Sequence, residues 1–144
     1  MPVFSERSLR LLSTADKRLQ ALFEEVVKTY DCTVLCGHRG KEDQEEAYRG
    51  GKSKVLWPFS KHNRLPSLAV DVVPWPIDWE DTRRLYHFAG YVQRVADELG
   101  IAVRWGGDFN QDGHLGNDRF VDGPHWEIAS DDPQSLAVVE DARI

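Results

Sequence analysis

The sequence predicts an α+β domain in which helices pack against a small sheet. Two segments, residues 19–30 and 85–99, carry apolar residues at three- and four-residue steps, which is the pattern of an amphipathic helix. Short apolar segments bounded by Gly, Pro or polar residues are typical of strands. Because helices and strands alternate in units of unequal length, an α+β arrangement is expected. The four predicted strands are Thr33–Cys36, Leu68–Val73, Ile101–Trp105 and His125–Ile128.

Length, composition and charge limit the classes of protein that the chain can belong to. Its 144 residues are most simply one domain, spanning 1–144, and are enough for a hydrophobic core. The net charge of −6 argues against nucleic-acid binding, which usually requires a basic face. No apolar run is long enough to span a membrane, and the N-terminus lacks the apolar segment of a secretory signal. We therefore expect synthesis in the cytoplasm, with help from another protein for any action outside it.

The elements of the N-terminal half follow from local signals. Residues 9–12 are rich in leucine and indicate a short first helix, after which Ser13 or Thr14 can cap the next one. Residues 41–48 are polar and helix-favouring, and the pair Gly50-Gly51 stops them. A third helix is therefore expected between the first two predicted strands.

The long helix predicted between Asp78 and Gly100 has a recognisable start, end and buried face. Asp78 can cap its N-terminus, with Asp81 at the capping-box position, and Gly100 ends it. His87 lies off the apolar stripe and is expected to be solvated. The stripe predicted to be buried consists of Leu85, Phe88, Ala89, Val92, Val95, Ala96 and Leu99.

Two short motifs suggest chemistry that their surroundings do not support. The Gly-Gly-Lys-Ser stretch at 50–53 is not a phosphate-binding loop, because a helix precedes it and Glu46 stands where the first glycine belongs. Cys32 and Cys36 would point to the same face of a strand, too far apart for a good disulfide. They are therefore expected to be buried free thiols.

Two histidines and an aspartate form the strongest chemical pattern in the chain. Asp71 lies inside an apolar run, where an uncompensated carboxylate is costly, and His62 precedes it on a polar loop. His125 opens the last strand, with Glu127 on the same face and Asp122 three residues before it. Two His and one Asp match a catalytic zinc site, which keeps a fourth position open. A nearby carboxylate can then act as base.

A cation near such a site would help to stabilise the negative charge that develops when a carbonyl is attacked. Arg39, which follows the predicted strand that ends at Cys36, is the candidate. The residues alone also allow Arg39 to be an ordinary loop arginine.

These motifs together resemble the zinc D-alanyl-D-alanine peptidase superfamily. Within it, they are most similar to the phage endolysins that cut the L-alanyl-D-glutamate bond of peptidoglycan. The resemblance extends from Gly37 to Ile128 and keeps the motifs in order. They are Gly37-x-Arg39-x4-Gln44, Ser60-x-His62, Ala69-x-Asp71, Trp105-Gly106-Gly107-Asp108 and Asp122-x-x-His125-Trp126-Glu127.

The resemblance implies a small, mostly antiparallel sheet with helices packed on it, and a role for each matching residue. The implied zinc ligands are His62, Asp71 and His125. Asp122 takes the position of the catalytic carboxylate, and Arg39 that of the arginine which polarises the scissile carbonyl. The residues implied to line the substrate site are Ser60 and Gln44.

One spacing departs from the family pattern. Eight residues separate His62 from Asp71, where the usual motif has six, so the loop at 63–67 is longer. A loop absorbs two residues without moving its ends. We therefore expect the zinc ligands to be unaffected and the substrate pocket beside the loop to be reshaped.

A second metal site is suggested by the glycine- and aspartate-rich loop before the last strand. Asp108, Asn110 and Asp112, followed by Gly113, copy the first half of a calcium-binding loop. The twelfth position, however, is Arg119 rather than Glu. Calcium binding and a plain turn built on Asx residues both remain open.

The leading hypothesis is a zinc peptidase that cleaves the L-Ala–D-Glu bond of peptidoglycan stem peptides as a one-domain, monomeric endolysin. The alternatives are a D-alanyl-D-alanine carboxypeptidase and a non-catalytic zinc-binding module of the same fold. The endolysin hypothesis implies action on the cell wall in the periplasm, once a separate protein has permeabilised the membrane. It involves neither nucleic acid nor insertion into the membrane.

Overall fold

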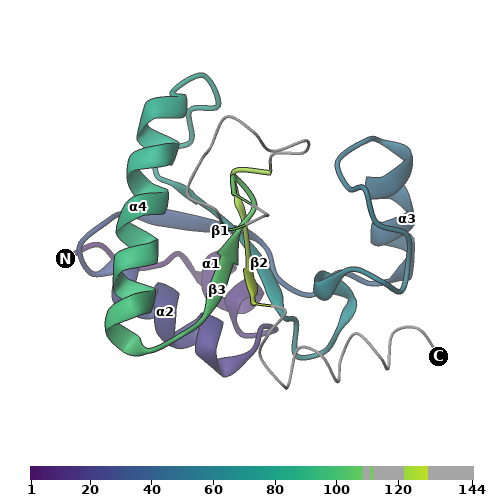
Figure 1. The fold of residues 1–144 in the computed structure, drawn as a ribbon, viewed down its shortest axis with the longest axis horizontal. Helices are drawn as coiled ribbons and strands as arrows, with labels where there is room; N and C mark the ends of the chain where they lie inside the picture. The colour runs from purple at the N-terminus through teal and green to yellow at the C-terminus, as the bar shows by residue number, and fades with distance from the viewer. Residues whose placement is uncertain (109–110, 112–121, 130–144) are drawn as a thin grey trace.

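The fold, a computed structural model, is described for residues 1–108, 111 and 122–129. Within these residues four strands form one antiparallel sheet in the order β1-β2-β4-β3, which confirms the predicted α+β class (Figure 1). The elements are α1 (Glu6–Leu12), α2 (Lys17–Val27), β1 (Cys32–Cys36), α3 (Lys41–Arg49), the 3₁₀ turn η1 (Lys61–Asn63), β2 (Ala69–Pro74), α4 (Thr82–Leu99), β3 (Val103–Trp105) and β4 (His125–Ile128).

One hydrophobic core joins the sheet to α1, α2 and α4, and α2 and α4 lie side by side at the left of Figure 1. Trp126 of β4 is central to it, because its ring meets Phe23 of α2 edge-on at 6.3 Å and stacks on Trp105 of β3 at 5.9 Å. Aromatic pairs of this kind add stability beyond the area they bury. The core thus holds β4 firmly, and with it His125.

The capping predictions for two helices were wrong by a few residues. Asp16, not Ser13 or Thr14, caps α2, since its side chain accepts a hydrogen bond from the amide of Arg18 at 2.9 Å. Asp81, not Asp78, caps α4. In both cases several Ser, Thr or Asp residues stand near the helix start, and tertiary packing selects among them.

The buried stripe of α4 is shorter than predicted at both ends. Five residues are buried, but Leu85 is only half-buried and Leu99 is 46% exposed. The core does not extend as far as the end of this helix. Of the described helices, none is long and apolar enough to cross a membrane.

A bulge in β1 separates the two cysteines. Val34 pairs with Val72, but the next paired residues are Cys36 and Asp71, so the register shifts between them. Cys32 therefore lies in the core, whereas Cys36 lies on the same side of the sheet as Asp71. Both thiols are free, as predicted, but only Cys32 is buried and Cys36 is partly exposed. The prediction that they share a face was wrong because of the bulge.

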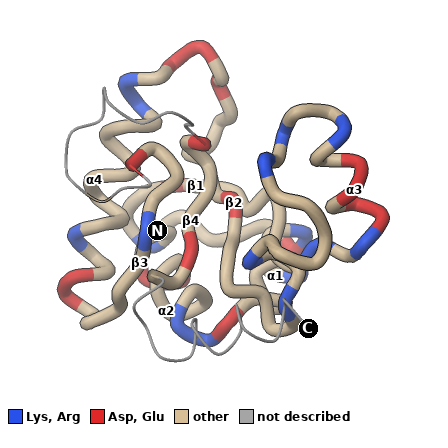
Figure 2. The backbone as a smooth tube through the Cα atoms, turned by 45° about the vertical axis from the view of Figure 1, so that its right-hand side comes forward, with Lys and Arg blue, Asp and Glu red and all other residues tan. Residues whose placement is uncertain are grey.

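The third helix, α3, lies on the opposite side of the molecule from α2 and α4 (Figure 1). Its sequence is almost entirely polar, and Figure 2 shows acidic and basic residues along it. Gln44 is its one buried residue. This helix is therefore not part of the hydrophobic core.

The loop at 63–67 packs against the junction of α1 and α2. The amide of Ser67 donates to Thr14 O at 2.9 Å, and Ser67 O accepts from the amide of Asp16 at 2.8 Å. The Ser67 hydroxyl also donates to Ala69 O at 2.6 Å. These bonds place the longer loop beside the N-terminal helices and hold the start of β2.

Candidate metal centre and active site

The sheet register places three chemically active side chains in one row. Asp71 of β2 pairs with Cys36 of β1 on one side and with His125 of β4 on the other. Directly paired residues of antiparallel strands project from the same face of the sheet. The bulge in β1 is what brings Cys36 into this row.

His62 approaches the row from outside the sheet, on the turn η1. Ser60 caps this turn, accepting a hydrogen bond from the amide of His62 at 3.2 Å, and its own amide donates to Asn63 Oδ1 at 3.0 Å. The imidazole is 2% exposed. A polar, Pro-containing segment thus carries a buried histidine because this reciprocal cap holds the turn.

Three donor atoms from His62, Asp71 and His125 converge on one point. His62 Nε2 lies 3.2 Å from Asp71 Oδ1 and 3.2 Å from His125 Nδ1, and His125 Nδ1 lies 3.4 Å from Asp71 Oδ1. In a tetrahedral zinc site with bonds of 2.0–2.1 Å, neighbouring ligand atoms lie about 3.3–3.4 Å apart. The spacing of the three atoms fits such an ion.

The other nitrogen of each ring is already hydrogen-bonded. His62 Nδ1 lies 2.8 Å from Gly37 O, and His125 Nε2 lies 2.7 Å from Glu127 Oε1. A carbonyl and a carboxylate can only accept, so these nitrogens carry the protons and leave His62 Nε2 and His125 Nδ1 as ligand atoms. Histidines that bind metals almost always have outer partners of this kind.

Glu127 is itself held by two cations. Its Oε2 lies 2.9 Å from Lys61 Nζ and 2.7 Å from an Arg104 nitrogen, and the side chain is 6% exposed. Burial would raise the pKa of Glu127, but its bond to His125 and the charges of Lys61 and Arg104 lower it to about 2. The carboxylate is therefore ionised and fixes the orientation of the His125 ring.

Without a metal, protons supply the positive charge in this cluster. Burial alone would lower the pKa of His62, but the charge and hydrogen bond of Asp71 raise it to about 10. Burial would raise the pKa of Asp71, yet the charges and hydrogen bonds of His62 and His125 hold it far below its usual range. A metal ion must displace such protons, so its affinity falls as the pH falls.

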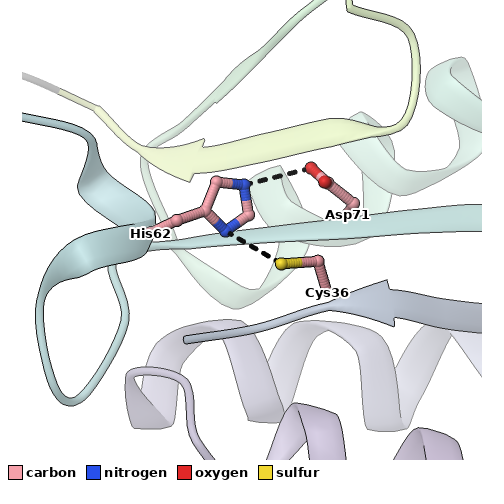
Figure 3. Close-up of side chains that lie close together, drawn as sticks. All are labelled: Cys36, His62 and Asp71. Carbon is pink, nitrogen blue, oxygen red and sulfur yellow. Dashed lines mark hydrogen bonds and ion pairs between the residues drawn. The ribbon is translucent and has the colours of Figure 1, made fainter. Parts of the chain in front are cut away.

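Cys36 belongs to a second group of ligand-type residues, with His62 and Asp71, whose ligand atoms lie within 4.8 Å of one another. Its sulfur lies 3.8 Å from His62 Nδ1, the nitrogen that faces Gly37 O. Figure 3 shows Cys36 and Asp71 at different nitrogens of the His62 ring. The atom set that includes His125 is therefore the better tetrahedral site.

Asp122 stands next to the cluster on the turn before β4. One oxygen of Asp122 and one ligand atom each of Asp71 and His125 lie within 4.8 Å of one another. Burial and the negative charge of Asp71 raise the pKa of Asp122, against the opposing charges of His125, His62 and Arg39. A carboxyl group with a raised pKa is suited to accept a proton during catalysis.

Gly106 holds this turn through its backbone. Its amide donates to His125 O at 2.8 Å, and its carbonyl accepts from the amide of Asp122 at 2.8 Å. A Cβ at this position would lie 2.0 Å from Asp122 O and 2.9 Å from His125 Cβ. Only glycine allows the chain to approach so closely here.

Arg39 lies within reach of the cluster. Its Nη2 is 3.6 Å from Asp71 Oδ2, and its amide donates to His62 O at 2.7 Å. The guanidinium is 17% exposed, so it is largely but not completely buried. Its positive charge can therefore face a group that binds beside Asp71.

Gln44 lies close to Arg39 but does not face solvent. The resemblance implied that Gln44 lines the substrate site, but the side chain is 0% exposed and bonds to Arg39 instead. The prediction that Gln44 contacts the substrate directly is therefore wrong. Ser60 is partly exposed, and the hydroxyl accepts the amide hydrogen bond that caps η1.

An open cleft leads to these residues. Cys36, Arg39, Asp71 and Asp122 are among the residues that line it. On one side lie α3 residues and the glycine turn after them, up to Lys52, and Trp79 also lines it. No residue of the 63–67 loop is among those that line it, and the effect of the longer loop on the substrate site stays a prediction.

The calcium hypothesis falls largely outside the described residues. Asn110 and Asp112 are not among them, and neither are Gly113 and Arg119. Asp108 is described, and its amide donates to Trp105 O at 3.0 Å. Calcium binding by Asp108, Asn110 and Asp112 therefore stays a prediction.

Comparison with known proteins connects this geometry to a family. A family model described as phage L-alanyl-D-glutamate peptidase matches residues 2–129. The chain belongs to this family. As a phage L-alanyl-D-glutamate peptidase it is a hydrolase that acts on peptidoglycan, and the matched residues include every part of the candidate active site.

Two relatives support the assignment to the phage L-alanyl-D-glutamate peptidases. The L-alanyl-D-glutamate peptidase of Escherichia phage T5 is 27% identical over 133 residues, which cover 87% of this chain and 96% of the relative. The crystal structure of the Serratia marcescens L-Ala D-Glu endopeptidase ChiX is 28% identical. It aligns with a TM-score of 0.69 over 89% of this chain and 91% of that one.

Sequence reasoning missed the parts of this peptidase site that depend on long-range contacts. Lys61 and Arg104 come together at Glu127 from segments far apart in the chain. Gly37 contributes only a backbone carbonyl. Only the position of Glu127 could be inferred locally. Residues two apart in a strand lie on the same face, so Glu127 had to share a face with His125.

Proposed function

We propose that the chain is a zinc-dependent endopeptidase that cleaves the L-Ala–D-Glu bond of peptidoglycan stem peptides, as a phage endolysin does. The observation that carries the proposal is the convergence of His62 Nε2, Asp71 Oδ1 and His125 Nδ1 at 3.2–3.4 Å from one another. Family membership supports the bond that is cut. Residues 1–144 act as one catalytic domain.

The donor set favours zinc over calcium and magnesium. Imidazole nitrogens with a single carboxylate oxygen suit zinc, whereas calcium and magnesium prefer sites made only of oxygen ligands. When bound, zinc acts as a Lewis acid and brings the pKa of water towards about 7. Three protein ligands leave a fourth position for this chemistry.

The surrounding residues then perform the remaining steps. The Asp122 carboxylate accepts the proton of the attacking water and delivers it to the departing amine, because its raised pKa suits both transfers. The Arg39 guanidinium donates to the carbonyl oxygen as negative charge develops there. The cleft between α3 and Trp79 holds the stem peptide over these groups.

Removal of the metal tests this function. Purified protein is expected to release new N-terminal D-Glu from isolated peptidoglycan, to lose this activity in a chelator and to regain it with zinc. The products are measured by mass spectrometry of the digested muropeptides, with a digest free of enzyme as the control.

The same measurement separates the alternatives. Release of terminal D-Ala without new N-terminal D-Glu would identify a D,D-carboxypeptidase instead. A protein that binds zinc but yields no product from any peptidoglycan would be a non-catalytic module.

A further inference from the structure

The polar helix α3 forms one side of the catalytic cleft but contributes only one buried residue to the fold. That residue is Gln44, which is 0% exposed. Most helices are held in place by an apolar face that packs on the core. Since α3 buries no apolar side chain, the contacts of this one amide are its only buried side-chain attachment among the described residues.

All four hydrogen-bonding positions of the Gln44 amide are in use. Its Nε2 donates to Ser53 Oγ at 3.0 Å and to Val55 O at 2.6 Å. Its Oε1 accepts from Arg39 Nη1 at 3.0 Å and from Asn63 Nδ2 at 3.1 Å. An amide side chain has two donor hydrogens and two acceptor lone pairs, so nothing is left unsatisfied.

The two ends of the amide connect different parts of the molecule. The nitrogen binds the segment that follows α3, at Ser53 and Val55. The oxygen binds Arg39 and Asn63, and Asn63 is the last residue of the turn that carries His62. Asn63 Nδ2 also donates to Arg39 O at 3.1 Å. One buried side chain thus joins the cleft wall to Arg39 and to the His62 turn.

We propose that Gln44 is a positioning residue that holds the Arg39 guanidinium in its catalytic orientation and docks α3 as the wall of the cleft. The inference rests on the proposed function of Arg39. With one nitrogen of the guanidinium held by Gln44, the other stays directed to the side of Asp71, 3.6 Å away. Without that bond the arginine is free to adopt other rotamers in the open cleft, and the geometry needed for catalysis is lost.

Gln44→Met tests the proposal, because methionine has nearly the same size and shape but cannot replace any of the four bonds. We expect kcat to fall about 10²-fold, as on removal of one donor to a developing oxyanion, with the zinc content unchanged. In an Arg39→Ala background the same substitution is expected to lower kcat less than about threefold, because residues that act as a unit are not additive.

Gln44→Glu separates the two ends of the amide. The carboxylate still accepts from Arg39 and Asn63 but cannot donate to Ser53 or Val55. It is expected to retain most of kcat. Amide hydrogen exchange, which requires no activity, is expected to be faster across α3 in both Gln44 variants and unchanged in β2 and β4.

Gln20→Met is the matched control. Gln20 makes a similar bond, from its Nε2 to Ala15 O at 2.8 Å, but on α2 and away from the cleft. It is expected to leave kcat and the exchange of α3 unchanged.

Several results would overturn the positioning role. The first two are a wild-type kcat in Gln44→Met, and kcat losses of Gln44→Met and Arg39→Ala that multiply in the double variant. The others are loss of zinc from Gln44→Met, and an equal loss of kcat in Gln44→Glu and Gln44→Met. Unchanged exchange of α3 in both variants would overturn the docking role. A wild-type protein without zinc-dependent cleavage would instead contradict the proposed function itself.

Discussion

Replacing Asp122 with Asn is expected to lower kcat about 10³-fold without removing the metal. The substitution keeps the size of the side chain and its place beside the cluster, but the amide cannot accept a proton, and loss of a general base costs 10²–10⁴-fold. No atom of Asp122 is among the three ligand atoms that lie 3.2–3.4 Å from one another. This variant should therefore bind zinc as the wild type does but lose most of its catalytic activity.

Steady-state kinetics on muropeptides and the zinc content of the purified variant provide the measurement for Asp122→Asn. Asp97→Asn is the control, because Asp97 lies exposed on α4 and its carboxylate accepts a bond from Gln93, away from the cleft. It should behave as the wild type. Wild-type kcat in Asp122→Asn would remove the base from the mechanism, and loss of zinc would make Asp122 a ligand.

Replacing His125 with Ala is expected to remove both the metal and the activity. The variant lacks one of three ligand atoms, so the fall in zinc affinity should exceed the 10–100-fold that is typical for loss of an outer partner of a ligand. It also leaves Glu127 without the 2.7 Å bond to the ring. Activity should fall below detection at zinc concentrations that saturate the wild type.

Zinc titration of the metal-free protein, monitored by calorimetry, measures the effect of His125→Ala. His87→Ala is the control, since His87 is an exposed histidine of α4 that contacts Tyr30 rather than the cleft. A His125→Ala protein that binds zinc as tightly as the wild type would exclude His125 from the ligand set.

The placement of the candidate ligands could be predicted because it depends on local patterns and one register. Asp71 lies in a short apolar strand and His125 in a short alternating one, and pairing these strands in an antiparallel sheet leaves few ways to bring the two polar side chains together. The helices behind the sheet were equally predictable, since their apolar stripes are long and regular.

What the sequence could not predict depends on irregular backbone and on contacts between distant segments. The bulge in β1 moves Cys36 to the face of Asp71, and an alternating pattern carries no signal for it. The burial of Gln44 had no signal in the sequence, because α3 is almost entirely polar and has no apolar stripe. Its burial follows from four partners, all of them outside the helix and none next to it in sequence.

The longer loop between His62 and Asp71 shows the same limit. Its length was visible in the sequence, and so was its position beside two of the ligands. The direction in which it extends was not, because this depends on the bonds between Ser67 and the junction of α1 and α2. Substrate specificity is therefore better sought at α3 and Trp79, which line the cleft.

The ligand set is tested most directly by anomalous diffraction at the zinc absorption edge, from crystals of the protein grown with zinc. We expect one strong peak about 2.0–2.2 Å from His62 Nε2, His125 Nδ1 and an oxygen of Asp71. A peak bonded to Cys36, or the absence of a peak between the two histidines, would contradict this ligand set.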